Sequence, residues 1–124
     1  MNGETQSWTL TFLDAATFQR DLRKLSRRTQ ATIRGALELL ARDGLLLMKT
    51  TWLKSLGSGL YEFRINRTID RGVRVVYRVF CSFQAQRVIL VVSGYDKLPD
   101  PSKKRQNDQI QKARSLLNNY KNGY

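Results

Sequence analysis

The chain has 124 residues, of which 41% are hydrophobic and 26% charged, which suits one domain with one core spanning residues 1–124. Its 22 Lys and Arg residues against 10 Asp and Glu give a net charge of +12, which favours a nucleic-acid or anionic-membrane partner over an inert scaffold. A membrane-spanning helix is excluded because the longest apolar runs, 45–48 and 88–92, are far shorter than the ~20 residues it needs.

The first part of the chain predicts a strand followed by a helical hairpin. Apolar residues alternate with threonines over 8–12, the pattern of a strand with one buried face. Asp14 and Ser26 stand where they can cap two amphipathic helices, and Gly44 is expected to end the second. Gly35 lies inside that second helix, where glycine is costly, so we expect another backbone to approach closely there.

The second part predicts a loop, three strands and a helix. Residues 52–59 are interpreted as a basic, glycine-bounded loop, and alternation then indicates three strands, Leu60–Ile65, Val73–Phe80 and Arg87–Ser93. Asp100 is expected to cap the last helix, with Pro101 at its first position. The predicted fold is therefore α+β, with an N-terminal strand, a helical hairpin, a three-stranded antiparallel meander and a C-terminal helix (β-α-α-β-β-β-α).

The predicted strands gather cations on one face. Alternation places Arg64, Arg74 and Arg78 opposite the apolar side chains of their strands. Residues 63–124 carry 13 Lys and Arg against 4 Asp and Glu, compared with 9 against 6 in residues 1–62. Crowded cations repel one another unless water or an anion lies between them. A phosphate chain is the partner that this pattern indicates.

Several kinds of site and compartment are disfavoured by composition. The chain has one cysteine, Cys81, and no histidine, so it lacks an internal disulfide, an ordinary zinc site and a Cys-His pair. Glu62, Asp70 and Asp96 form no recognisable metal-ligand pattern, and Glu62 is expected to pair with an arginine across the strands. Residues 1–7 lack the basic and apolar regions of a signal peptide. We therefore expect a cytoplasmic protein without metal or cofactor.

The cations suit RNA cleavage by the 2′-hydroxyl group. That reaction needs a base for the hydroxyl proton, cations for the transition state and an acid for the leaving oxygen. A lysine among arginines has a lowered pKa, so Lys54 or Lys97 can be the base. Arg64 and Arg74 suit phosphate oxygens, and Tyr95 offers a ring for stacking and a hydroxyl for proton transfer. Further candidates for RNA binding are Arg78, Lys103, Lys104 and Arg105.

Three segments carry a resemblance to a known family. The run from Leu56 to Ile65 (LGSGLYEFRI), the run from Gly72 to Phe80 (GVRVVYRVF) and the run from Ser93 to Lys97 (SGYDK) resemble the RelE/ParE toxin superfamily, and its phage-derived, HigB-like branch in particular. The resemblance implies a type II toxin that cuts messenger RNA on the translating ribosome. It also implies a cognate antitoxin, which would be a helix-turn-helix protein. Operator DNA would be bound only through this antitoxin.

The resemblance also implies site residues. By position, Arg64, Arg74 and Lys97 fall on basic sites of RelE-like toxins, and Lys54 matches the lysine before the Leu-Gly-x-Gly-Leu-Tyr-Glu run of the HigB-like branch. Glu62 departs from RelE itself, which has lysine there, so the general base stays open. Two alternatives remain: a gyrase-inhibiting toxin of the ParE branch, which lacks this basic set, and a non-catalytic RNA-binding module with steep salt dependence.

Overall fold

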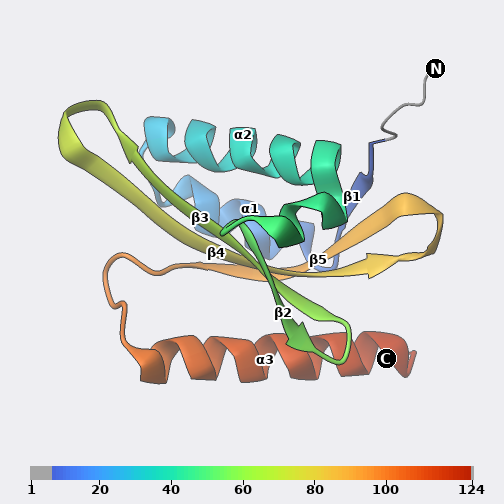
Figure 1. Cartoon of the computed structure of the whole chain (residues 1–124). Coiled ribbons are helices and arrows are strands. Elements are labelled where there is room, and N and C mark those ends of the chain that lie inside the picture. Colours follow the sequence, from blue (N-terminus) through green and yellow to red (C-terminus); the bar gives the residue numbers. More distant parts are fainter. Residues whose placement is uncertain (1–6, 124) are drawn as a thin grey trace, which may run out of the picture.

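The computed structural model describes residues 7–123 (Figure 1). Residues 1–6, in which the sequence shows no signal-peptide pattern, lie outside the described part. The structure contains a five-stranded sheet and three α-helices, so the predicted α+β class is confirmed. In chain order the elements are β1 (Thr9–Phe12), α1 (Ala15–Arg23), α2 (Arg27–Asp43), the short 3-10 helix η1 (Gly44–Lys49), β2 (Leu53–Gly57), β3 (Leu60–Ile69), β4 (Val73–Gln84), β5 (Val88–Asp96) and α3 (Lys103–Lys121).

The sheet has the strand order β1-β5-β4-β3-β2. Strands β2 to β5 follow one another as an antiparallel meander, whereas β1 lies at an edge, parallel to β5. The meander therefore has four strands, and the predicted three-stranded meander is wrong by one. The three predicted strands are present, and β3, β4 and β5 each extend beyond their predicted ends.

The additional strand, β2, lies in the segment that was expected to be a loop. Its Leu53 lies opposite Phe63 and is buried in the core, and a bulge follows between Ser55 and Gly57. Leu56 packs against the other side of the sheet. Because its two leucines face opposite sides and a bulge interrupts it, this strand shows no period-two pattern.

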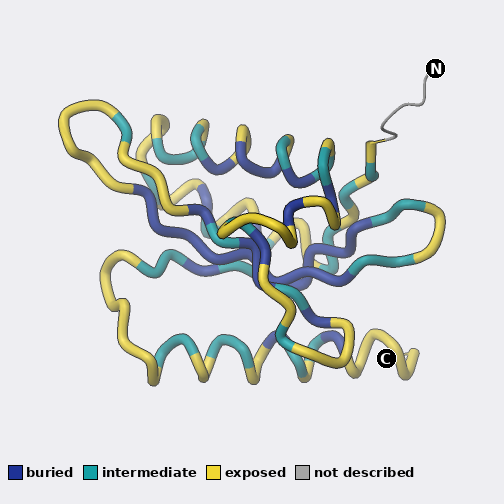
Figure 2. The backbone as a smooth tube through the Cα atoms, in the orientation of Figure 1, coloured by how far each residue is buried: buried dark blue, intermediate teal, exposed yellow. Residues whose placement is uncertain are grey.

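Helices cover both faces of the sheet (Figure 1). The α1–α2 hairpin covers one face, and α3 covers part of the other. The buried residues lie along the middle of the sheet and the inner sides of the helices (Figure 2). Side chains such as Phe63, Ile65 and Val79 pack with Ile33 and Leu40 of α2. This burial holds the strands, and with them the polar side chains of the second face, in a fixed register.

The N-terminal caps of two of the three α-helices are the residues that the sequence predicted. Asp14 and Ser26 cap α1 and α2 as predicted, and Gly44, with φ +51°, ends α2. The cap of α3 is Ser102, whose Oγ accepts a hydrogen bond from the Arg105 N–H at 3.2 Å. Asp100 instead accepts from the Ser102 N–H, at 3.1 Å, so its side chain shapes the turn and α3 begins two residues later than expected.

The expected close contact at Gly35 is wrong, because Gly35 is exposed and a Cβ there would meet nothing within 4 Å. The close approach occurs at Gly94 of β5. A Cβ at Gly94 would lie 2.9 Å from the Tyr77 ring and 3.0 Å from the Phe18 ring. Glycine at this position lets Phe18 of α1 pack directly on the sheet.

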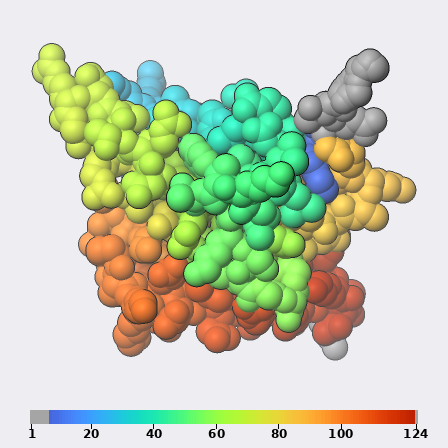
Figure 3. All heavy atoms as spheres, in the orientation of Figure 1, coloured from blue at the N-terminus to red at the C-terminus, as the bar shows by residue number. Residues whose placement is uncertain are grey.

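Helix α3 is fixed on the second face by the hairpin between β2 and β3. The Arg114 guanidinium donates to the carbonyl oxygens of Leu56 and Gly57, at 3.0 and 3.2 Å, and Lys121 Nζ donates to that of Ser58 at 3.2 Å. In Figure 3 this green hairpin lies against the orange and red atoms of α3. Beneath α3 are buried apolar residues such as Leu60, Phe80, Leu90 and Val92. Most of the other side chains on this sheet face are polar. No helix within residues 7–123 is long and apolar enough to cross a membrane.

Candidate functional site

Polar side chains from four strands meet on the part of the second sheet face that α3 leaves open. Residues opposite one another on neighbouring strands share a face, and so do residues two apart on one strand. Lys97, just past β5, is tied to this surface because its N–H donates to the Val76 carbonyl at 2.8 Å. We call this surface the basic face; its members are Lys54, Glu62, Arg64, Asn66, Arg74, Arg78, Tyr95 and Lys97. It includes all five predicted catalytic residues: Lys54, Arg64, Arg74, Tyr95 and Lys97.

The centre of the basic face is a row of three residues. Arg64 on β3 lies directly opposite Arg78 on β4, and Arg78 lies opposite Tyr95 on β5. Like charges at opposed positions of a sheet destabilise it. The two arginines of this row therefore need a nearby anion to offset their repulsion. Within the described structure an anionic side chain is bonded to Arg64 but not to Arg78.

That anion is Glu62, which is 0% exposed. Its Oε1 accepts a hydrogen bond from Arg64 Nε at 3.1 Å, and its Oε2 accepts one from Gln106 Nε2 of α3 at 3.0 Å. The expectation that Glu62 pairs across the strands is wrong, because Arg64 follows it by two residues on the same strand. Two hydrogen bonds, one charged, offset part of the cost of burying the carboxylate.

Arg78 lacks such a partner within the described structure. It is 8% exposed, its Nε is buried without a hydrogen bond, and its Nη1 makes only a long contact of 3.5 Å with the Tyr77 carbonyl oxygen. Burial lowers the pKa of Arg78, and the charge of Arg64 adds to this while that of Glu62 opposes it. A buried cation with an unsatisfied donor is costly. Binding of an anionic ligand to Arg78 would offset this cost.

A small pocket opens beside the two arginines. Its volume is about 230 Å³. The lining residues are Thr51, Trp52, Arg64, Asn66 and Arg78. Arg64 and Arg78 thus both line a cavity that solvent, or a ligand, can enter.

Lys97 is the lysine that the arginines perturb. Partial burial lowers its pKa, and the charges of Arg78 and Arg64 lower it further, while Glu62 acts in the opposite direction. The sequence predicted a lowered pKa for a lysine among arginines; the direction agrees for Lys97, but burial contributes more to it than either arginine does. Lys54 is exposed on the edge strand β2, opposite Glu62, and so lies farther from the central row.

Tyr95 contributes a hydroxyl rather than a free ring. It is 6% exposed, and its ring stacks with Phe80 at 6.0 Å between centroids and carries the Arg105 guanidinium at 5.0 Å. The predicted stacking of an RNA base on Tyr95 therefore has no room in this arrangement. Burial raises the pKa of Tyr95, as does the charge of Glu62, so the hydroxyl keeps its proton near neutral pH. This hydroxyl is buried without a partner in the described structure.

The remaining predicted cations lie around this centre. Arg74, opposite Thr68, is four residues from Arg78 along β4, or about 13 Å, and its Nη2 donates to Asn66 Oδ1 at 3.3 Å. Arg105 donates to the Asp96 carbonyl oxygen at 2.7 Å and so braces the end of β5. Two further cations are exposed at the start of α3: Lys103 and Lys104, the latter paired with Asp108 at 3.3 Å.

Sequence reasoning missed Asn66, Thr51 and Gln106. Asn66 could have been found, because it follows Arg64 by two residues and so shares its face. Thr51 and Gln106 carried no such signal, since a loop and a helix bring them to the sheet. Among residues 7–123, no three His, Cys, Asp or Glu side chains are grouped where they could hold a metal ion.

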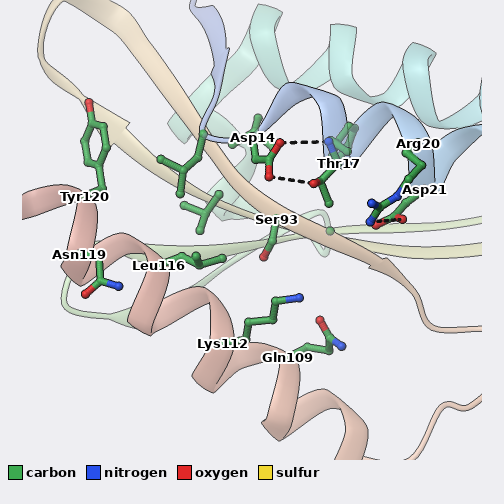
Figure 4. A pocket seen from close by; sticks show the side chains of 15 residues that line it. Asp14, Thr17, Arg20, Asp21, Ser93, Gln109, Lys112, Leu116, Asn119 and Tyr120 are labelled. Atoms are coloured by element: carbon green, nitrogen blue, oxygen red, sulfur yellow. Dashed lines mark hydrogen bonds and ion pairs between the residues drawn. The ribbon is translucent and has the colours of Figure 1, made fainter. Parts of the chain in front are cut away.

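A larger groove lies between α1 and α3 (Figure 4). It has a volume of about 620 Å³. Its walls carry Asp14 and Asp21 as well as Arg20 and Lys112, and apolar side chains such as Leu116 lie between them. The groove has mixed charge, in contrast to the basic face.

One comparison with known proteins gives a match. The family model described as "Phage derived protein Gp49-like (DUF891)" matches residues 20–118. The matched range runs from α1 into α3 and includes every member of the basic face. None of the curated proteins matches the chain.

Proposed function

The chain belongs to the phage-derived Gp49-like family, a family of RelE-like toxins, and from this premise we propose that it is the toxin of a type II toxin–antitoxin system. Its activity is cleavage of messenger RNA on the translating ribosome, as in the HigB-like branch, by a metal-independent endoribonuclease mechanism. The product is a truncated message and arrested translation.

The observation that carries the proposal is Arg78. Its guanidinium is buried, lacks an acceptor for Nε and lies opposite a second arginine, Arg64. Such an arrangement is unfavourable in the free protein and becomes favourable when phosphate oxygens enter between the two forks. Stabilisation of this kind, aimed at the charge that develops in the transition state, is usually the largest single contribution to catalysis.

The cleavage step follows from the groups around that phosphate. Lys97, in its neutral form, takes the proton of the 2′-hydroxyl, and the 2′-oxygen attacks the adjacent phosphorus. The bond from phosphorus to the 5′-oxygen breaks, which leaves a 2′,3′-cyclic phosphate and a 5′-hydroxyl end. Tyr95 gives its proton to the departing 5′-oxygen and regains one from solvent, while Lys97 releases the proton that it took.

Other residues support this centre. Glu62 and Gln106 hold Arg64 in place. Exposed cations contact the RNA backbone of the message or the ribosome: Lys54, Lys103 and Lys104. Arg105 keeps the end of β5 and Tyr95 in position.

A toxin family implies an antitoxin partner. With a net charge of +12, this chain favours an antitoxin whose contact segment is rich in Asp and Glu, because complementary fields speed encounter and neutralise the basic face. We propose that this partner is a helix-turn-helix protein and alone binds operator DNA. The toxin acts in the cytoplasm, where the ribosomes are.

The test is a cleavage assay with purified toxin and ribosomes translating a defined message. Cleavage with a 5′-hydroxyl product, abolished or strongly slowed when ribosomes are omitted, is the expected result. A gyrase supercoiling assay runs beside it. Gyrase inhibition without cleavage would favour the ParE-like alternative, and ribosome or RNA binding without cleavage would favour a binding module.

A further inference from the structure

Arg105, in the first turn of α3, makes two kinds of contact. Its Nη1 donates to the carbonyl oxygen of Asp96 at 2.7 Å and to that of Asp100 at 3.3 Å. Its guanidinium carbon lies 5.0 Å from the centre of the Tyr95 ring, within the roughly 6 Å at which a cation is attracted to an aromatic face. Arg105 is half-buried, so water screens this attraction only in part.

The charge of Arg105 is not matched by a bonded carboxylate. Its hydrogen bonds from Nη1 go to backbone carbonyl oxygens, and no ion pair between side chains of residues 7–123 includes it. The preceding cation differs, since Lys104 pairs with Asp108 at 3.3 Å. The Tyr95 ring therefore lies beside a positive charge that no carboxylate neutralises by direct contact.

Charges of both signs act on the buried Tyr95 side chain. Burial raises its pKa, as do the charges of Glu62 and Asp100, whereas those of Arg78 and Arg105 lower it. In the proposed reaction Arg78 binds the phosphate, whose negative charge offsets that of the arginine. Arg105 is then the cation that still acts on Tyr95 while RNA is bound.

From this arrangement we infer that Arg105 assists Tyr95 in protonating the leaving group, by stabilising the negative charge that the tyrosine acquires as it gives up its proton. The inference rests on the proposed function, in which the O–H bond of Tyr95 breaks and its proton goes to the departing 5′-oxygen. A cation over the ring attracts the phenolate more strongly than the neutral phenol, so the contact strengthens in the transition state. Because Arg105 acts through Tyr95, it is a positioning residue.

The first test changes the leaving group. A synthetic message carries sulfur in place of the 5′-oxygen at a mapped cleavage position, and single-turnover cleavage on ribosomes is compared with that of the ordinary message. A thiol loses its proton far more readily than an alcohol, so the thiolate departs without an acid. Arg105→Gln can still donate to the Asp96 carbonyl oxygen but carries no charge. It should cut the ordinary message about tenfold more slowly than the parent and the sulfur-containing message at the parent rate.

Arg114→Gln is the matched control. Arg114 is also on α3 and also donates to two backbone carbonyl oxygens, at 3.0 and 3.2 Å, but it lies over no aromatic ring in the described part of the chain. Its two cleavage rates should keep the ratio found in the parent. Arg105→Lys keeps a charge near the ring and should retain most of the parent rate on the ordinary message. A lysine variant as slow as Arg105→Gln would overturn the inference.

Tyr95→Phe separates this inference from the proposed function. It should be slow on the ordinary message and regain the parent rate on the sulfur-containing one. If Tyr95→Phe regains that rate and Arg105→Gln does not, the inference is overturned and the proposed cleavage stands. If the sulfur restores neither variant, Tyr95 is not the acid and the inference fails with it, while ribosome-dependent cleavage again stands.

A second measurement does not depend on cleavage. The pKa of the Tyr95 hydroxyl is followed by NMR in protein isotope-labelled at tyrosine Cζ. Loss of a cation favours the neutral phenol, so Arg105→Gln should raise this pKa by roughly half a pH unit, the effect of one charge at about 5 Å in water, and Arg114→Gln should leave it unchanged. An unchanged pKa in Arg105→Gln contradicts the inference. The expected change in a protein that cuts no RNA would instead contradict the proposed function alone.

Discussion

Replacing Glu62 by glutamine removes the only carboxylate that is bonded to the arginine pair within the described structure. The variant Glu62→Gln keeps an acceptor for Arg64 but leaves the opposed guanidinium groups of Arg64 and Arg78 without a compensating charge. Breaking a fully buried ion pair costs about 3–5 kcal/mol. The Arg64 side chain is 35% exposed, so water compensates part of this loss, and we expect a loss of roughly 2–3 kcal/mol in the free energy of unfolding.

This loss can be measured by urea and thermal unfolding. For a chain of this length, 2–3 kcal/mol corresponds to a fall in Tm of about 8–12 °C. Glu38→Gln on α2 is the matched control, because Glu38 is exposed, and its effect should stay within about 0.5 kcal/mol. If Glu62→Gln proved as stable as the parent, the carboxylate would not be what offsets the repulsion between the arginines.

The same variant has a second, electrostatic consequence. The charge of Glu62 raises the pKa of Lys97, against burial and the arginines, which lower it. Its removal lowers the pKa of Lys97 further. Since the neutral lysine is the active form, the alkaline rise of the cleavage rate should move to lower pH in Glu62→Gln. If Glu62 had a purely structural role, Glu62→Gln would reduce the cleavage rate without shifting the pH at which the rate rises.

Three further outcomes are expected. Lys97→Arg should lower the single-turnover cleavage rate by about 10²–10⁴-fold and abolish its rise at alkaline pH, because arginine keeps its proton. A rate equal to that of the parent would assign the role of base to Lys54 instead. Ser102→Ala removes the cap of α3 and should lower the free energy of unfolding, measured in urea, by about 1 kcal/mol. An unchanged free energy of unfolding would indicate that Asp100 caps α3 instead. The Cys81 thiol, whose pKa burial raises to about 12, should resist alkylation at pH 8 until the chain unfolds; rapid labelling of the folded protein would contradict its burial.

The strands with a clear apolar period, β3 and β4, were predictable from sequence, whereas the short strand β2 was not. Apolar residues alternate with polar ones over much of β3 and β4, because one face of each strand is buried. This alternation made both strands predictable. β2 was missed because its two leucines, Leu53 and Leu56, are three positions apart and so face opposite sides, which leaves no run of alternating apolar residues on either face. The caps of α1 and α2 were found because a single side chain decides each of them.

The candidate site was predictable only in part, because register carries no local signal. A register shift between β4 and β5, next to Phe80, changes the alternation of β5, so that Leu90, Val92 and Tyr95 all face α3. This shift brings Tyr95 and Lys97 beside Arg78. Alternation alone would have placed Tyr95 on the face of α1 and α2. Gln106 reaches Glu62 from a helix 44 residues away in sequence, which no motif indicated.

The most direct test of the account compares activity and stability in Arg78→Gln. Arg78 is proposed to be unfavourable in the free protein and essential to the transition state. We predict a loss of roughly 10²–10³-fold in the single-turnover cleavage rate on ribosomes, together with a Tm equal to or above that of the parent, because an unpaired buried charge is removed. Arg27→Gln, an exposed cation on α2, serves as the control and should change neither. A variant that cuts RNA at the parent rate would contradict the central claim.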